Sequence, residues 1–111
     1  SISYPLTFNF NIPHGIASSL ALIPLLEINK NKIQQDIDII CNKLGLKNIT
    51  ELKEKIKKIP KGIIPFSLRE WKVKKSDFTK IVSQSFTKGR MNNNIVDLSS
   101  KDVLEIINLI Y

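Results

Sequence analysis

The sequence predicts an all-α protein, a bundle of helices with no sheet, and three observations support this fold class. Apolar residues recur mostly at intervals of three and four, which is the spacing of one helix face. No stretch alternates apolar and polar residues cleanly enough to predict a strand. Asn48 and Ser99 are each followed three positions later by an acidic residue, Glu51 and Asp102, a spacing typical of helix starts.

The first 30 residues predict a lead-in and one apolar helix. Residues 1–13 contain Pro5 and Pro13 and predict an irregular segment, with Pro13 well placed for the first turn of the helix that follows. Residues from about 14 to 28 are apolar nearly all round, so we expect this helix to be buried on all sides. Pro24 is expected to bend it or to interrupt its hydrogen bonds.

The next two predicted helices are amphipathic and cover residues of about 31–44 and 49–59. The first is expected to end at Gly45, since glycine is favoured just after a helix C-terminus. The second begins after Asn48, and its lysines face away from its apolar seam. The two apolar stripes are formed by Ile33, Ile37, Ile40 and Leu44, and by Ile49, Leu52, Ile56 and Ile59.

The last part of the chain predicts two more helices separated by loops. Residues 60–67, rich in Pro and Gly, predict a loop. A helix is expected from near Ser76 to Gly89, then a loop over 90–98, then a helix that begins after Ser99. The apolar positions of these two helices are Phe78, Ile81, Val82 and Phe86, and Val103, Leu104, Ile107 and Ile110.

Length and composition predict one domain spanning residues 1–111 of an ordinary globular type. The single cysteine, Cys41, excludes an internal disulfide and cysteine-based zinc motifs, and among apolar neighbours it is expected to be a small buried side chain. A reducing compartment, and hence the cytoplasm, is the expected location. The apolar run from Ile16 to Ile28 is shorter than the roughly 20 residues that a membrane-spanning helix needs. No membrane partner is therefore expected.

The charge pattern raises the alternative of a nucleic-acid binder. The net charge is +7, and residues 43–75 contain eleven Lys or Arg residues and three Glu. Almost all of this positive charge is lysine, and the region lacks the interleaved aromatic residues that stack on bases. We therefore interpret the region as a solvated lysine-rich surface and expect no nucleic-acid partner.

His14, the only histidine, stands between Pro13 and Gly15 at the start of the apolar helix. The dipole at a helix start favours neutral imidazole, which is the form that binds metals. A divalent metal site, however, needs about three protein ligands, so these residues alone leave open a structural or capping histidine. With one histidine and one cysteine, the chain has no serine–histidine–aspartate order and no histidine pair at metal-ligand spacing.

Three segments resemble the iron-containing alcohol dehydrogenases. These are "YPLTFNFNIPHGIASSLALIPLLEINK", with its Pro-His-Gly motif and downstream proline, "LREWKVKKSDFTKIVSQSF" and "NNNIVDLSSKDVLEIINLIY". They occur in the family's order, and the resemblance as a whole extends over nearly all of the chain. Within the family, "SISYPLT" before "IPHG" is most similar to the branch that includes phosphonoacetaldehyde reductases.

The resemblance implies a C-terminal helical domain that holds a divalent metal, iron or zinc, beside an N-terminal Rossmann-like domain that binds NAD(P). It implies one Asp and three His as ligands, of which the Pro-His-Gly histidine corresponds to His14. The preceding ligand would fall just before Ser1, and the others further upstream. A family histidine that helps to relay a proton aligns with Tyr4, and this departure puts that role in doubt, although a phenol can also pass a proton.

The function expected from this resemblance is that of a metal-site domain of an NAD(P)-dependent alcohol dehydrogenase, acting on a small alcohol or aldehyde. Lacking the dinucleotide-binding domain, the chain is expected to be inactive alone, to bind neither metal nor NAD(P) tightly, and to depend on that domain as its partner. Its apolar surface also leaves room for a homo-oligomer. The alternative is a non-catalytic helical remnant or a protein-interaction module, and the residues encoded upstream of Ser1 would discriminate between the two.

Overall fold

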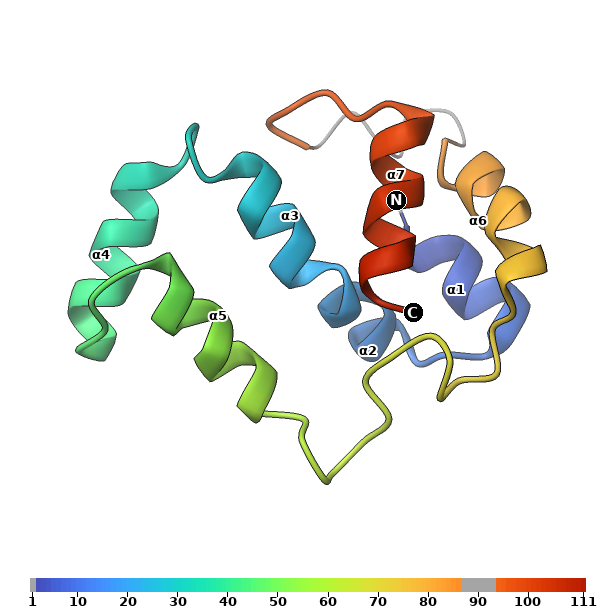
Figure 1. Cartoon of the computed structure of the whole chain (residues 1–111), viewed down its shortest axis with the longest axis horizontal. Helices are drawn as coiled ribbons and strands as arrows, with labels where there is room; N and C mark the ends of the chain where they lie inside the picture. The colour runs from blue at the N-terminus through green and yellow to red at the C-terminus, as the bar shows by residue number, and fades with distance from the viewer. Residues whose placement is uncertain (1, 87–93) are drawn as a thin grey trace.

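The computed structural model describes residues 2–86 and 94–111, and this part of the chain is helical and contains no strand (Figure 1). The predicted all-α fold is therefore confirmed. The α-helices are α1 Ser3–Phe10, α2 His14–Leu20, α3 Leu22–Asn29, α4 Gln34–Leu44, α5 Ile49–Lys58, α6 Phe78–Ser85 and α7 Ser100–Leu109, with a 3₁₀ turn, η1, at Lys75–Asp77.

Helix α1 corrects the expectation of an irregular lead-in over residues 1–13. Pro5 is the third residue of α1, and a proline is tolerated there because the N–H groups of the first turn have no partner within the helix. The helix ends where Asn11 adopts the left-handed conformation, with φ at 55°, and its N–H donates to the Thr7 carbonyl. The presence of Pro5 therefore does not prevent a helix over these residues, because it lies at a permitted position.

The apolar segment after Pro13 forms two helices, so the expectation of one helix from 14 to 28 is wrong. Pro24 lacks the N–H that would bond to the Leu20 carbonyl, and its ring crowds that carbonyl. The helix is therefore interrupted at Ala21, which lies between α2 and α3. The segment is also not buried on all sides, because His14, Gly15, Ser18, Ser19 and Leu22 are exposed.

Helices α4 and α5 form a hairpin close to the one predicted. Helix α4 begins at Gln34, three residues later than expected, and ends at Gly45, whose φ is 69°. The Asn48 side chain accepts a hydrogen bond from the Glu51 N–H, as the capping spacing predicted. Ile40 and Leu44, which were expected to share the buried stripe of α4, are instead about half exposed.

The last two helices begin close to where the sequence predicted them. The helix expected from near Ser76 to Gly89 begins with η1 and continues as α6 only to Ser85, so it ends earlier than expected. Phe86, expected on its apolar side, is the C-cap and is 37 % exposed. Gly89 and residues 90–93 of the expected loop lie outside the described residues. Ser99 and Asp102 form the predicted capping box at the start of α7. Leu104, expected on the apolar side of that helix, is 39 % exposed.

The buried side chains form two clusters that we call the main core and the small core. The main core lies among α1, α2, α6 and α7 and contains, among others, Leu6, Ile12, Ile81 and Ile107. The small core lies between α4 and α5, around Ile37, Cys41 and Leu52, so Cys41 is buried as expected. In Figure 1 the α4–α5 hairpin lies on one side of α3, and α1, α6 and α7 lie on the other.

Polar contacts join α3 to both sides. Glu27 accepts hydrogen bonds from Lys30 and, at 3.0 Å, from Lys53 of α5. Asn29, 6 % exposed at the end of α3, donates to the Asn94 side chain and accepts from the Val96 N–H. Within the described ranges, no helix has the length and apolar character to cross a bilayer.

Candidate metal-ligand site at the start of α2

His14 is the first residue of α2, and its position follows from the three residues before it. Asn11 ends α1, and the Ile12 side chain is fully buried in the main core, which anchors the connection. Pro13 is extended, and its carbonyl accepts the Ala17 N–H at 2.9 Å, which closes the first turn of α2. This arrangement leaves the His14 side chain exposed at the start of a helix that is anchored on its other side by Ala17 and Leu20.

The His14 imidazole is available to a ligand as far as the described residues show. No hydrogen bond to its ring is present among residues 2–86 and 94–111. The nearby hydroxyl of Ser19 is occupied, because it donates to the Gly15 carbonyl one turn earlier, at 2.7 Å. Ser19 therefore hydrogen-bonds to the backbone of the helix start rather than to the imidazole.

Tyr4 lies on α1, a helix that packs against both α2 and α6. Its ring is half-buried and stacks on Phe8, one turn further along, with ring centroids 5.8 Å apart and an interplanar angle of 16°. Phe8 itself is 68 % exposed. The two residues singled out from the sequence, Tyr4 and His14, therefore lie on consecutive, contacting helices.

The other metal-ligating side chains of the described part of the chain are dispersed. No three of its His, Cys, Asp or Glu residues gather into a group that could hold a metal ion. Hydrogen bonds from Lys30 and Lys53 lower the pKa of Glu27, and hydrogen bonds from the Ser99 backbone and hydroxyl lower the pKa of Asp102. Cys41 is buried in the small core and the carboxylates do not gather with His14, so the exposed imidazole fits one ligand of a divalent metal and not a complete site.

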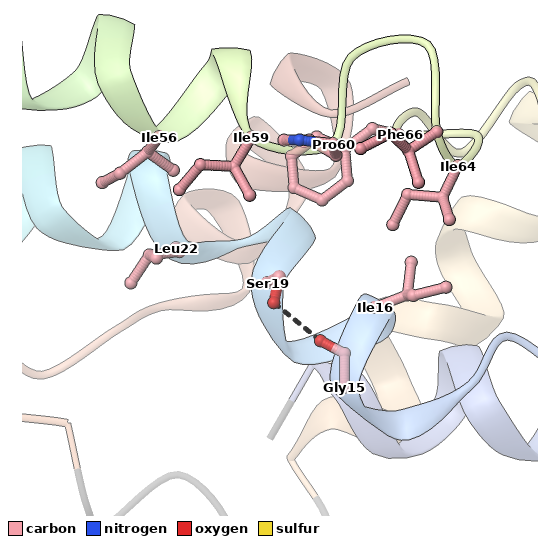
Figure 2. A pocket seen from close by; sticks show the side chains of 10 residues that line it. Gly15, Ile16, Ser19, Leu22, Ile56, Ile59, Pro60, Ile64 and Phe66 are labelled. Carbon is pink, nitrogen blue, oxygen red and sulfur yellow. Dashed lines mark hydrogen bonds between the residues drawn. The ribbon is translucent and has the colours of Figure 1, made fainter.

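A pocket that the sequence did not predict opens beside this helix (Figure 2). Its volume is about 380 Å³, and it lies between the α2–α3 segment and the end of α5 with the loop that follows. Pro24 indicated in the sequence that the apolar segment is interrupted. The pocket itself could not be predicted, because its opposite wall is formed by residues some 40 positions further along the chain. The lining residues are Gly15, Ile16, Ser19, Leu22, Ile56, Ile59, Pro60, Ile63, Ile64 and Phe66.

These features define the class of the molecule: an all-helical domain that presents a single exposed imidazole at the start of a helix. A family model described as "Fe-containing alcohol dehydrogenase family, C-terminal" matches residues 1–111. The chain therefore belongs to the Fe-containing alcohol dehydrogenase family and corresponds to its C-terminal domain. Family membership implies a divalent metal, NAD and an N-terminal domain in the complete enzyme. No curated protein and no solved structure gave a match in the two further comparisons.

Proposed function

We propose that this chain is the metal-site domain of an NAD(P)-dependent alcohol dehydrogenase, in which His14 holds a divalent metal, iron or zinc, together with ligands outside these residues. The observation that carries the proposal is the exposed His14 imidazole, which has no hydrogen-bond partner among the described residues, in a chain of this family. The remaining ligands and the dinucleotide site belong to the partner domain and to residues upstream. The complete enzyme is proposed to act in the cytoplasm.

The chain's own residues would have two tasks in this enzyme. A divalent metal supplies Lewis-acid polarisation of a substrate oxygen, and NAD(P) supplies hydride transfer. His14 would hold its ring nitrogen in a constant position, because Ile12 and Ala17 anchor both sides of the turn that carries it. Tyr4 would pass a proton through its phenol, in place of the histidine that the family resemblance implies at this position.

Activity measurements on the complete polypeptide that contains these residues test the proposal. We expect NAD(P)-linked oxidation of small alcohols, and loss of at least 100-fold in kcat/KM in His14→Ala, since a metal ligand is removed. Ser18→Ala, on the exposed side of the same helix, should keep activity within twofold. The isolated 111-residue chain should show no turnover. Turnover by that chain alone would contradict the proposal that the remaining ligands and the dinucleotide site lie outside these residues.

Two finer assignments are tested in the same assay. Tyr4→Phe removes only the hydroxyl and should lower kcat by about 10- to 100-fold while leaving bound metal unchanged. Reduction of phosphonoacetaldehyde in preference to other aldehydes would support the branch of the family that the first residues resemble. Wild-type turnover in Tyr4→Phe would remove Tyr4 from the mechanism.

A second candidate function is a non-catalytic helical module. Both candidates allow for the lack of a complete ligand group among residues 2–86 and 94–111, so they differ in what they predict for the complete polypeptide. The helical module predicts that the complete polypeptide binds no stoichiometric metal, and that His14→Ala changes nothing except local stability.

A further inference from the structure

The segment from the last turn of α5 to the turn that follows it, residues 55–64, exposes three isoleucines, and we call it the tip. Ile59, the C-cap of α5, is 69 % exposed, and Ile63 is 78 % exposed, the largest value among the exposed large hydrophobic side chains of the described residues. Ile64 is 37 % exposed. Single exposed apolar residues are common on proteins, whereas several in one segment mark a surface that binds something.

The backbone of the tip is an ordered turn that projects from the molecule. The N–H groups of Ile63 and Ile64 donate to the Pro60 carbonyl, at 2.9 and 3.2 Å. Gly62 adopts a φ of 76°, a left-handed conformation that favours glycine. In Figure 1 the turn after α5 is the lowest point of the view and extends beyond the helices. The exposed isoleucines are therefore held where a flat surface can reach them.

The tip is also strongly basic. It contains no acidic residue, and its lysines, all of them exposed, are Lys55, Lys57, Lys58 and Lys61. Lys57 pairs with Glu54 at 3.3 Å, and the other three make no ion pair with any described residue. The dipole at the end of α5 favours lysines there, but it does not account for Lys61, which lies after the helix, or for the isoleucines exposed beside the lysines.

We propose that the tip docks the complete polypeptide on a membrane surface rich in anionic lipids, with the isoleucines among the lipid headgroups and the lysines beside their negative charges. Exposed apolar side chains flanked by lysines are typical of segments that lie in a membrane interface. The rest of the polypeptide is a poorer partner for this surface, because lysine is depleted in protein–protein interfaces. A nucleic acid would use the lysines but not the isoleucines.

This proposal departs from the expectation that the chain has no membrane partner. That expectation rested on the length of the apolar run, whereas binding at a membrane surface needs no spanning helix. Anionic lipids are enriched in the cytoplasmic leaflet, so the proposal agrees with a cytoplasmic enzyme. It is independent of the proposed function, because neither His14 nor Tyr4 belongs to the tip.

Co-sedimentation of the complete polypeptide with phosphatidylcholine vesicles, with and without about 30 % phosphatidylserine, tests the proposal. We expect binding to the anionic vesicles to be at least about tenfold tighter than to the neutral ones. This difference should disappear near 1 M salt, where the screening length falls to about 3 Å. Equal binding to both vesicles, or binding by the isolated 111-residue chain but not by the complete polypeptide, would overturn the proposal, and so would no binding at all.

The contribution of the lysines is measured with the triple variant Lys55→Gln, Lys58→Gln and Lys61→Gln. Each lysine near an anionic membrane strengthens binding about fivefold, so the triple variant should bind about 100-fold more weakly. The matched control removes the same charge at exposed positions outside the tip and should stay within about threefold of the wild type, because distant charges are screened. Equal weakening in both would show that net charge alone drives binding, and would refute a role of the tip. The control substitutions are Lys32→Gln, Lys80→Gln and Lys101→Gln.

The double variant Ile59→Ser and Ile63→Ser separates a membrane from a nucleic acid. Both side chains are largely exposed, so folding should be little affected, which circular dichroism checks. The variant should bind anionic vesicles at least about tenfold more weakly, because apolar surface no longer enters the interface. Leu109→Ser, at a side chain that is 75 % exposed at the end of α7, should bind like the wild type. Wild-type binding in the double variant would show that the lysines act through charge alone, as toward a nucleic acid, and would contradict membrane docking.

Discussion

Replacing Asn29 with alanine tests the contact that fastens the end of α3 to the segment before α7. The Asn29 side chain is 6 % exposed and makes three hydrogen bonds: to the Leu25 carbonyl at 2.8 Å, to the Asn94 side chain at 3.1 Å, and from the Val96 N–H at 3.2 Å. The bond to Leu25 is local to the helix and is easily replaced. The other two bonds span more than 60 residues, and they carry the effect.

The expected magnitude follows from these two bonds. Each bond contributes about 0.5–1.5 kcal/mol net to stability. Removing the Asn29 side chain also leaves the Asn94 side chain and the Val96 N–H without this partner in a partly buried position. We therefore expect Asn29→Ala to lower the free energy of unfolding by about 2 kcal/mol, which corresponds to a fall in Tm of about 8–10 °C for a chain of this size. Urea unfolding followed by circular dichroism measures the change directly.

The matched control for this measurement is Asn31→Ala. Asn31 is exposed two residues further on, so the change should cost less than about 0.5 kcal/mol. If Asn29→Ala unfolds at the same urea concentration as Asn31→Ala, the contact between α3 and residues 94–96 contributes nothing, and the reasoning is refuted.

Two further predictions concern acid and local opening. In the folded chain the pKa values of Glu27 and Asp102 lie below their ordinary values of 4.5 and 3.8, so near these pH values the folded state binds fewer protons than the unfolded state. The stabilisation by the two carboxylates is therefore complete above their ordinary pKa values. It is lost as the pH falls through their lowered pKa values in the folded chain. Tm should therefore drop below pH 4.5, and less steeply in Glu27→Gln; an unchanged slope would contradict this assignment. In hydrogen exchange, the amides of α4 and α5 should exchange before those of α6 and α7, because the small core buries fewer side chains than the main core; uniform protection would contradict the two-core description.

The sequence predicted the elements whose signals are local. The capping residues Asn48 and Ser99 and the terminating Gly45 all act within one turn of the chain, and the structure places helix ends at each of them. Pro5 and Pro24 were harder to interpret, because the effect of a proline depends on its position within a turn. Pro5 is accepted because it is the third residue of α1. Pro24 lies inside α3, and the helical segment is interrupted three residues before it, at Ala21.

The features that depend on contacts between distant residues could not be predicted. Periodicity placed Ile40 with Ile37 on one stripe, but α5, which packs against α4, covers only part of the α4 surface. Likewise, the pocket needs Gly15 to face Ile63, and no pattern in the sequence relates residues nearly 50 positions apart. His14 was found because Pro13 and Gly15 mark it locally, although its role in binding a metal stays a prediction.

The amount of divalent metal bound by the complete polypeptide, compared between the wild type and His14→Ala, tests the central claim most directly. Elemental analysis of both proteins, after dialysis and with matched circular dichroism, gives the metal-to-chain ratio. We predict about one iron or zinc per chain in the wild type and at least a tenfold lower ratio in the variant. Equal ratios in the two proteins would show that the imidazole at the start of α2 holds no metal.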